Sequence, residues 1–188
     1  MTEKSRGQSR MMPGEVENPS RSAASQGAPS ASNSRRIMLL TRKAEFSASH
    51  VCLNPALSAE ENQAIYGANA NPQGHGHNFV VEVTLEGEPD PVTGMVFDLR
   101  ELKEIINAEV VEPMDHRFLN REIPHFANVV PTTENLAREI WRRIALRVGA
   151  PHAHARPRAN NVRLKNVRLY ETADLYVDCT AADFAEEQ

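Results

Sequence analysis

The chain has 188 residues, of which 40% are hydrophobic and 24% are charged, an ordinary composition for a globular protein. Its 21 Lys and Arg against 25 Asp and Glu give a formal net charge of −4, so nucleic acid is not an expected partner. No apolar run reaches the roughly 18 residues of a membrane-spanning helix, so no membrane partner is expected. Two cysteines cannot form a disulfide framework, which favours a reducing, cytoplasmic compartment.

Composition divides the chain into a tail and one domain. Residues 1–36 contain eight serines, no aromatic residue and one large aliphatic residue, Val16. Such a stretch buries too little apolar surface to offset its chain entropy, so we predict that it is disordered. Residues 37–180 are the expected folded domain, and residues 181–188 are expected to be a flexible C-terminus.

Four segments carry the alternating apolar pattern of β-strands. They are residues 37–50, 75–86, about 161–170 and 174–179. In the third segment the apolar positions change phase between Leu164 and Val167, which predicts a β-bulge.

Two helices are expected between the second and third strands. The first follows Asp98, has apolar residues at helical spacing from Leu99 onward, and is expected to stop at Pro113. The second begins at Thr132 or Thr133 and ends before Gly149. Helices inserted into a run of antiparallel strands predict an α+β fold.

Three histidines combine the placement and the chemistry of a metal site. His75 and His77 stand two apart at the start of a strand, so both rings project from one side of the sheet. His50 ends the preceding strand, and antiparallel pairing would bring that end to the same place. Three nitrogen ligands suit Zn²⁺ with an open fourth position. The alternative is that each is an ordinary surface or core histidine.

The other histidines have weaker contexts. His152 and His154 repeat the His-x-His spacing, but they lie in a loop rich in Ala, Pro and Arg and are expected to be solvated. His125 is expected to be structural.

Several polar residues outside the histidine trio could serve catalysis or binding. Asp115 could orient the ring of His116 and stabilise its protonated form, although a turn aspartate beside a surface histidine is the simpler interpretation. Glu171 ends a strand and could pair with a planar ring rich in N–H groups. Residues 132–134 (Thr-Thr-Glu) are what a helix N-terminus favours.

Six motifs follow one another in a diagnostic order. They are FSASH (46–50), NPQGHGHN (71–78), DPVTGMVFDLRELK (90–103), MDHRFLN (114–120), PTTEN (131–135) and YET (170–172). Together they resemble the 6-pyruvoyltetrahydropterin synthase family, which includes the bacterial 6-carboxytetrahydropterin synthases of the queuosine pathway. The resemblance covers about residues 37–180.

The resemblance implies the tunnelling fold, a four-stranded antiparallel sheet with two helices between strands two and three. Subunits of this kind assemble through their sheet edges into trimers, commonly stacked as hexamers, and unpaired edges give a physical reason to do so. The implied substrate is 7,8-dihydroneopterin triphosphate. The implied reaction eliminates triphosphate and gives a 6-substituted tetrahydropterin of the 6-pyruvoyl or 6-carboxy type.

The resemblance also implies roles for individual residues. The zinc ligands would be His50, His75 and His77. The proton-relay pair would be Asp115 and His116. The residues around the amino-pyrimidine ring of the pterin would be Glu171 as its anchor, with Thr132, Thr133 and Glu134 beside it.

One position departs from the family pattern. The family's general base is a cysteine six residues before the first histidine of the pair, and Asn69 stands there. An amide has no proton-accepting role near neutral pH. Cys52, two residues after His50, is a candidate substitute, because zinc and a nearby His116 would lower the pKa of its thiol. The alternative is that Cys52 is a small buried hydrophobe.

The missing base leaves three functions open. The first is an active zinc lyase that uses Cys52 or the Asp115–His116 pair as its base. The second is an aldolase-like cleavage of the side chain toward a 6-hydroxymethylpterin. The third is a catalytically silent homologue that binds zinc and pterin without turnover.

Overall fold

The computed structural model describes residues 36–149 and 161–184. The tail predicted to be disordered lies outside the described residues except for Arg36, as do His152 and His154. The segment expected to be flexible from residue 181 begins with the 3₁₀ turn η4 (Ala181–Phe184), and its remainder lies outside the described residues.

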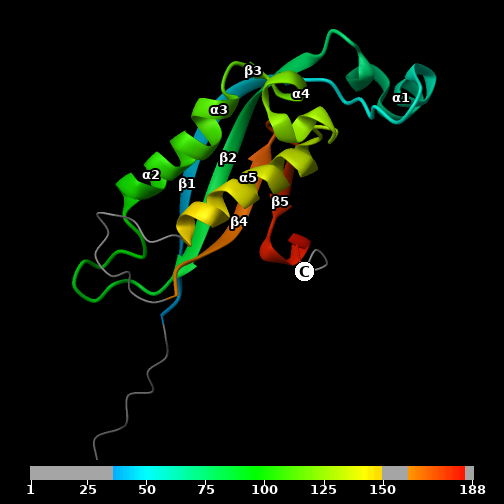
Figure 1. Ribbon diagram of the computed structural model, residues 1–188. Helices are drawn as coiled ribbons and strands as arrows, with labels where there is room; N and C mark the ends of the chain where they lie inside the picture. The colour runs from blue at the N-terminus through cyan, green and yellow to red at the C-terminus, as the bar shows by residue number, and fades with distance from the viewer. Residues whose placement is uncertain (1–35, 150–160, 185–188) are drawn as a thin grey trace, which may run out of the picture. The chain divides into compact units, whose positions relative to one another are not determined.

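A single sheet carries the fold (Figure 1). Its strands are β1 (Met38–His50), β2 (His75–Gly87), β3 (Arg117–Phe118), β4 (Arg163–Tyr170) and β5 (Tyr176–Cys179). Their spatial order is β3-β1-β2-β4-β5. The four long strands pair antiparallel, as the alternating pattern predicted.

The expectation of a four-stranded sheet is wrong, because the described residues form five strands. The additional strand, β3, pairs parallel with the end of β1 through Ala48 and Ser49. Two residues are too few to show an alternating pattern, so periodicity could not predict this strand.

The predicted bulge in the third long strand is confirmed. Thr84 of β2 pairs with Asn166, whereas the next residue, Leu85, pairs with Leu164. Lys165 is therefore the extra residue, and the change of phase in the apolar positions of β4 follows from it.

Eight helical segments lie between these strands in the part of the sequence that the structure describes. Their bounds are α1 (Ala59–Tyr66), η1 (Gly67–Ala70), α2 (Leu99–Ile106), η2 (Asn107–Val111), α3 (Glu112–Met114), α4 (Leu119–Glu122), η3 (Pro124–Ala127) and α5 (Thr133–Val148). Helix α5 crosses β4 and β5, whereas α1 lies away from them beyond one end of the sheet (Figure 1). Among the described residues, no helix has the length and apolar character needed to cross a membrane.

Helix α5 follows its prediction and α2 departs from it. The Thr132 side chain caps α5, and the predicted stripe from Ala137 to Val148 is buried against the sheet. Helix α2 does not stop at Pro113, because a π-helical turn, η2, and the short α3 carry the chain one residue beyond it. Leu99, expected at the start of the buried stripe of α2, is 48% exposed.

The register of β1 and β2 determines which residues face the helices. Phe46 pairs with Phe79 and both are buried in the core, so every second residue toward the strand ends faces the same way. His50 pairs with His75, and His77 lies opposite the buried Ala48. The three histidines therefore lie on the helix-covered face at one end of the sheet.

Candidate metal centre

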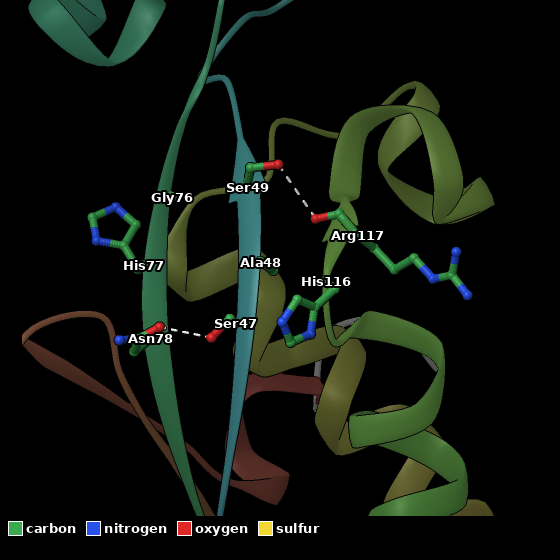
Figure 2. A pocket seen from close by; sticks show the side chains of 8 residues that line it. All are labelled: Ser47, Ala48, Ser49, Gly76, His77, Asn78, His116 and Arg117. Carbon is green, nitrogen blue, oxygen red and sulfur yellow. Dashed lines mark hydrogen bonds between the residues drawn. The ribbon is translucent and has the colours of Figure 1, made fainter.

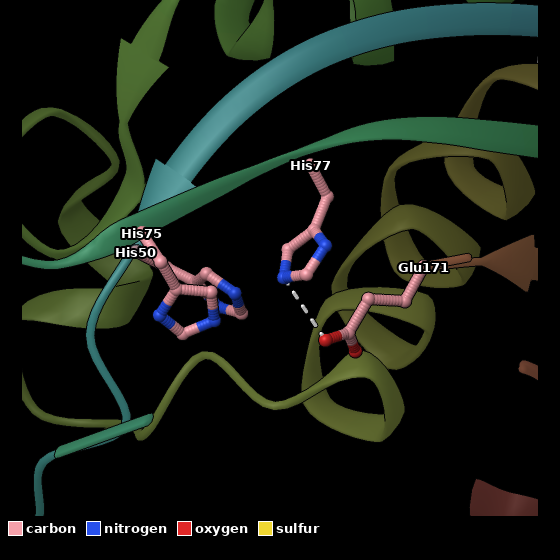
Figure 3. Close-up of side chains that lie close together, drawn as sticks. All are labelled: His50, His75, His77 and Glu171. Atoms are coloured by element: carbon pink, nitrogen blue, oxygen red, sulfur yellow. Dashed lines mark ion pairs between the residues drawn. The ribbon is translucent and has the colours of Figure 1, made fainter. Parts of the chain in front are cut away.

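The predicted histidine trio is brought together by the pairing of two strand ends (Figure 3). The ring centroids lie 4.5 Å apart for His50 and His75, 5.3 Å for His50 and His77, and 4.9 Å for His75 and His77. With Glu171, each residue offers one ligand atom within 4.8 Å of the others. The four side chains form a cluster that could hold one metal ion.

The orientation of His50 is set by a backbone carbonyl. His50 is 1% exposed, and its Nδ1 lies 2.7 Å from the carbonyl oxygen of Pro131. Because a carbonyl can only accept, Nδ1 carries the proton and Nε2 presents a lone pair to the cluster. A hydrogen bond on the outer nitrogen is the usual support for a metal-ligating histidine.

The electrostatics of the cluster suit a cation. Burial is the main reason that the pKa values of His50 and His75 lie below their ordinary value of 6.5, which favours the neutral form that binds metals. Within the described residues, Nε2 of His50 and both ring nitrogens of His75 are buried without a hydrogen-bond partner. Buried imidazole nitrogens without a hydrogen-bond partner, gathered in one cluster of ligand atoms, fit a Zn²⁺ site.

Glu171, just beyond the end of β4, completes the cluster. Its Oε1 lies 3.1 Å from Nε2 of His77 (Figure 3). Its Oε2 accepts a hydrogen bond from the Thr133 hydroxyl. Thr133 is buried in the first turn of α5, where the positive end of the helix dipole favours a carboxylate. The carboxylate is thereby held beside the histidines by a fixed donor.

The other residues predicted to lie around a bound ring serve the start of α5. The Thr132 hydroxyl accepts a hydrogen bond from the backbone N–H of Asn135 at 3.4 Å, which caps the helix. Glu134 is exposed in the first turn of the same helix.

The Asp115–His116 pair forms as predicted, but apart from the trio. Asp115 Oδ2 lies 2.7 Å from Nδ1 of His116, and its Oδ1 accepts from the backbone N–H of Ser47 at 2.7 Å. Both interactions lower the pKa of Asp115, and the hydrogen bond from the Ser47 backbone has the larger effect. In Figure 2, β1 and β2 lie between the ring of His116 and the ring of His77. Whether the pair acts together with the trio stays a prediction.

Cys52 lies beside Asn69, the position where the sequence resemblance predicts the family's base. The backbone N–H of Cys52 donates to the carbonyl oxygen of Asn69 at 2.9 Å, and Cys52 is 6% exposed. Burial, reinforced by the charges of Glu171 and Glu134, raises the pKa of the Cys52 thiol. His116 is not among the groups that shift this pKa, and the lowering expected with bound zinc stays a prediction.

Sequence reasoning missed two groups that support the centre. The carbonyl of Pro131 has no signature in a sequence, since every residue carries one. The Asn120 side chain hydrogen-bonds both backbone groups of Val51, the residue after His50. Asn120 stands in the MDHRFLN motif, but the motif alone does not show what its amide contacts.

His125 contacts Phe126 and Glu139, away from the trio.

An α+β fold with a cluster of three histidines and a carboxylate at one sheet end defines a candidate metal-dependent enzyme. Residues 39–182 match the family model described as 6-pyruvoyl tetrahydropterin synthase, so the chain belongs to that family. The family is one of tetrahydropterin synthase-type lyases, and the match confirms the predicted resemblance.

Relatives and a solved structure agree with this assignment. The chain is 50% identical over 123 residues to a 6-pyruvoyl tetrahydrobiopterin synthase of Poecilia reticulata, covering 65% of this chain and 82% of the relative. It is 48% identical over 102 residues to that of Homo sapiens, covering 54% and 70%. A 6-pyruvoyl tetrahydropterin synthase structure from Caenorhabditis elegans superposes with a TM-score of 0.69 at 32% identity, covering 77% and 96%.

We predict that the metal-free protein loses stability as the pH falls below about 6.5, the ordinary imidazole value. The folded-state pKa values of His50 and His75 are lowered, so in mild acid the unfolded chain binds more protons than the folded chain. The free energy of unfolding in the presence of a chelator should stay level above about pH 7 and decline toward about pH 5. Chemical denaturation at each pH measures it.

The matched variant is His50→Gln, because a neutral glutamine amide can still donate to the Pro131 carbonyl. Its stability should depend less on pH over the same interval. A double His50→Gln, His75→Gln protein with the wild-type slope would contradict the prediction.

Proposed function

We propose that the protein is a zinc-dependent lyase that eliminates triphosphate from 7,8-dihydroneopterin triphosphate and forms 6-pyruvoyltetrahydropterin. The observation that carries the proposal is the convergence of His50, His75 and His77 at one sheet end of a family member, with partnerless ring nitrogens on His50 and His75. The pyruvoyl product is favoured over the carboxy product because the relatives from fish and human carry the pyruvoyl name.

The three histidines would hold the zinc, with His50 oriented by the Pro131 carbonyl. When bound, Zn²⁺ supplies Lewis acidity that makes the C–H bonds beside the side-chain hydroxyls of the substrate more acidic. The chain's own task is to hold the pterin in place, to move a proton between adjacent side-chain carbons, and to keep water from the departing triphosphate.

Incubation of the zinc-loaded protein with 7,8-dihydroneopterin triphosphate tests the proposal. Triphosphate release with a 6-pyruvoyl product is the expected result, and His77→Ala should lose both tight zinc binding and turnover because one of three ligands is missing. His154→Ala, the same change in the second His-x-His pair, is the control and should keep both.

Three outcomes would overturn the proposed reaction. A 6-hydroxymethylpterin product would establish the aldolase-like alternative. Zinc and pterin binding without triphosphate release would establish a silent homologue. Equal loss of zinc from His77→Ala and His154→Ala would mean that the metal site is elsewhere.

Glu171 is proposed as the anchor of the pterin ring. A carboxylate accepts from the adjacent N–H groups of an amino-pyrimidine in a charge-assisted, two-point contact. Thr133 donates to Oε2 and holds the carboxylate in place. The residues before and after it, Thr132 and Glu134, would lie beside the ring.

Glu171→Gln should weaken pterin binding by about 2 kcal/mol, roughly thirtyfold, because a charge-assisted hydrogen bond is lost. Fluorescence titration with 7,8-dihydroneopterin measures this affinity. Asp174→Asn, which removes an exposed carboxylate from the same turn, is the control. Unchanged pterin affinity in Glu171→Gln, or a loss of zinc instead, would assign Glu171 to the metal rather than to the ring.

The relay pair is proposed to act on a centre in another copy of the chain. Asp115 is held ionised beside His116, so the outer nitrogen of this imidazole can exchange protons. Within one chain, β1 and β2 lie between the ring of His116 and the ring of His77 (Figure 2). Assembly into trimers or stacked trimers, through the edges of the sheet, would bring the pair of one copy to the histidines of the next.

Mixed oligomers test this arrangement. His77→Ala and His116→Ala should each be inactive alone, whereas oligomers assembled from an equal mixture should recover up to about a quarter of wild-type turnover, because such sites combine an intact trio with an intact pair. Steady-state triphosphate release measures the recovery. No recovery in mixed oligomers confirmed by mass spectrometry would contradict the proposal.

Cys52 is proposed as the base in place of the absent family cysteine. Its backbone is hydrogen-bonded to that of Asn69, so its thiol starts from the neighbourhood of the missing group. The charge of Glu171 acts on this thiol, which places it near the anchor of the ring.

Cys52→Ala should lower turnover by roughly 10²- to 10⁴-fold, the usual range for a general base, while zinc content stays at the wild-type level. Cys179→Ala is the matched control, because Cys179 is equally buried but lies on β5. Turnover unaffected by Cys52→Ala would leave this thiol as a small buried hydrophobe.

A further inference from the structure

Residues 115–120 run beside the end of β1 and contact it at every second residue. Ser47 exchanges backbone hydrogen bonds with the relay pair, donating to Asp115 Oδ1 at 2.7 Å and accepting from the His116 N–H at 2.6 Å. The Ser49 hydroxyl donates to the carbonyl of Arg117 at 3.4 Å (Figure 2). The next alternate residue of the strand is Val51, which contacts Asn120.

The Asn120 side chain extends the ladder of β1 by one residue. Backbone pairing of β1 with β2 ends at His50, so Val51 has no strand partner there. Asn120 Oδ1 accepts from the Val51 N–H at 2.9 Å, and its Nδ2 donates to the Val51 carbonyl at 3.0 Å. Only an amide offers an acceptor and a donor side by side, so this two-point contact needs Asn rather than Asp or Leu.

The start of β2, which carries His75 and His77, contacts the same segment. Gly74, with a positive φ of 71°, directly precedes His75. A Cβ built on Gly74 would lie 2.8 Å from Phe118 Cε2 and 2.9 Å from the His50 carbonyl oxygen. The start of β2 is thus packed closely against both the end of β1 and the segment that carries Asn120.

We propose that Asn120 is a positioning residue for the metal centre. It fixes the backbone of Val51, which lies between the ligand His50 and the proposed base Cys52, and it links this point to the segment that carries the relay pair. The inference rests on the proposed zinc site and concerns how its ligands are held, since Asn120 itself touches neither metal nor substrate.

Loss of the two hydrogen bonds between Asn120 and Val51 should lower the affinity of the protein for zinc. Groups that hold ligands from outside the coordination sphere typically contribute 10- to 100-fold to metal affinity. Asn120→Ala should lower zinc affinity by about tenfold, the lower end of that range, because it acts through the backbone. Asn120→Asp keeps the acceptor but not the donor, so its affinity should lie between those of the alanine variant and the wild type.

The experiment compares the full-length wild type, Asn120→Ala, Asn120→Asp and the control Asn62→Ala. Asn62 is also a buried amide that bonds backbone groups, at Asn54, Leu57 and Ser58, and none of these hydrogen bonds involves residues 50–52. Chelator competition measures zinc affinity, and the visible absorption of the Co²⁺-substituted protein reports ligand geometry. Hydrogen exchange of the peptide containing Val51 reports the contact without metal.

Weaker zinc binding, a changed Co²⁺ spectrum and faster exchange at Val51 in the Asn120 variants, but not in Asn62→Ala, are the expected results. Wild-type zinc affinity and spectrum in a folded Asn120→Ala protein would overturn this inference and leave the proposed function intact. A wild-type chain that binds no zinc would overturn the proposed function itself, and exchange at Val51 would still decide whether the contact holds the backbone. If Asn120→Ala does not fold, Asn120→Asp decides by the same criteria.

Discussion

The pairing of β1 with β2 is the constraint on which the metal centre depends. The two strands pair along their whole 13-residue lengths, from Met38 opposite Gly87 to His50 opposite His75. A slip of one residue would turn His50 to the opposite face from His75 and His77. The same slip would remove Phe46 from the core, so apolar burial holds the register that the chemistry needs.

The histidine cluster buries imidazole nitrogens that have no hydrogen-bond partner among the described residues. His50 is almost fully buried, and a ring nitrogen facing its neighbours has no partner among the described residues. Unsatisfied buried nitrogens cost stability unless something binds them. Metal binding at this cluster would therefore be linked to folding, because a bound metal would offset the cost of burying these nitrogens.

Sequence patterns predicted the parts of the fold that extend over many residues. The four long strands, the α5 stripe and the bulge at Lys165 each leave a periodic trace. The strand β3 is only two residues long, and the π-helical turn before Pro113 depends on contacts that a single helix pattern does not contain.

The candidate site was predictable where its chemistry coincided with strand spacing. The trio followed from the His-x-His pair and from His50 at the end of the neighbouring strand. The position of Glu171 at a strand end suggested only that it could pair with a planar ring, and its place beside the histidines was not predicted from spacing. The separation of His116 from the trio was not predictable, because adjacency in sequence does not say on which side of a sheet a loop lies.

The entry into α5 has a consequence for how the protein can change. Pro131, Thr132 and Thr133 are consecutive, and they contact His50, cap the helix and hold Glu171 in turn. A helix advances about 1.5 Å per residue. An axial displacement of α5 by even a fraction of that step would move the Pro131 carbonyl that contacts His50 and the Thr133 hydroxyl that contacts Glu171 at the same time. Core substitutions that would adapt the protein to heat or cold are therefore restricted to those that leave the axial position of α5 unchanged.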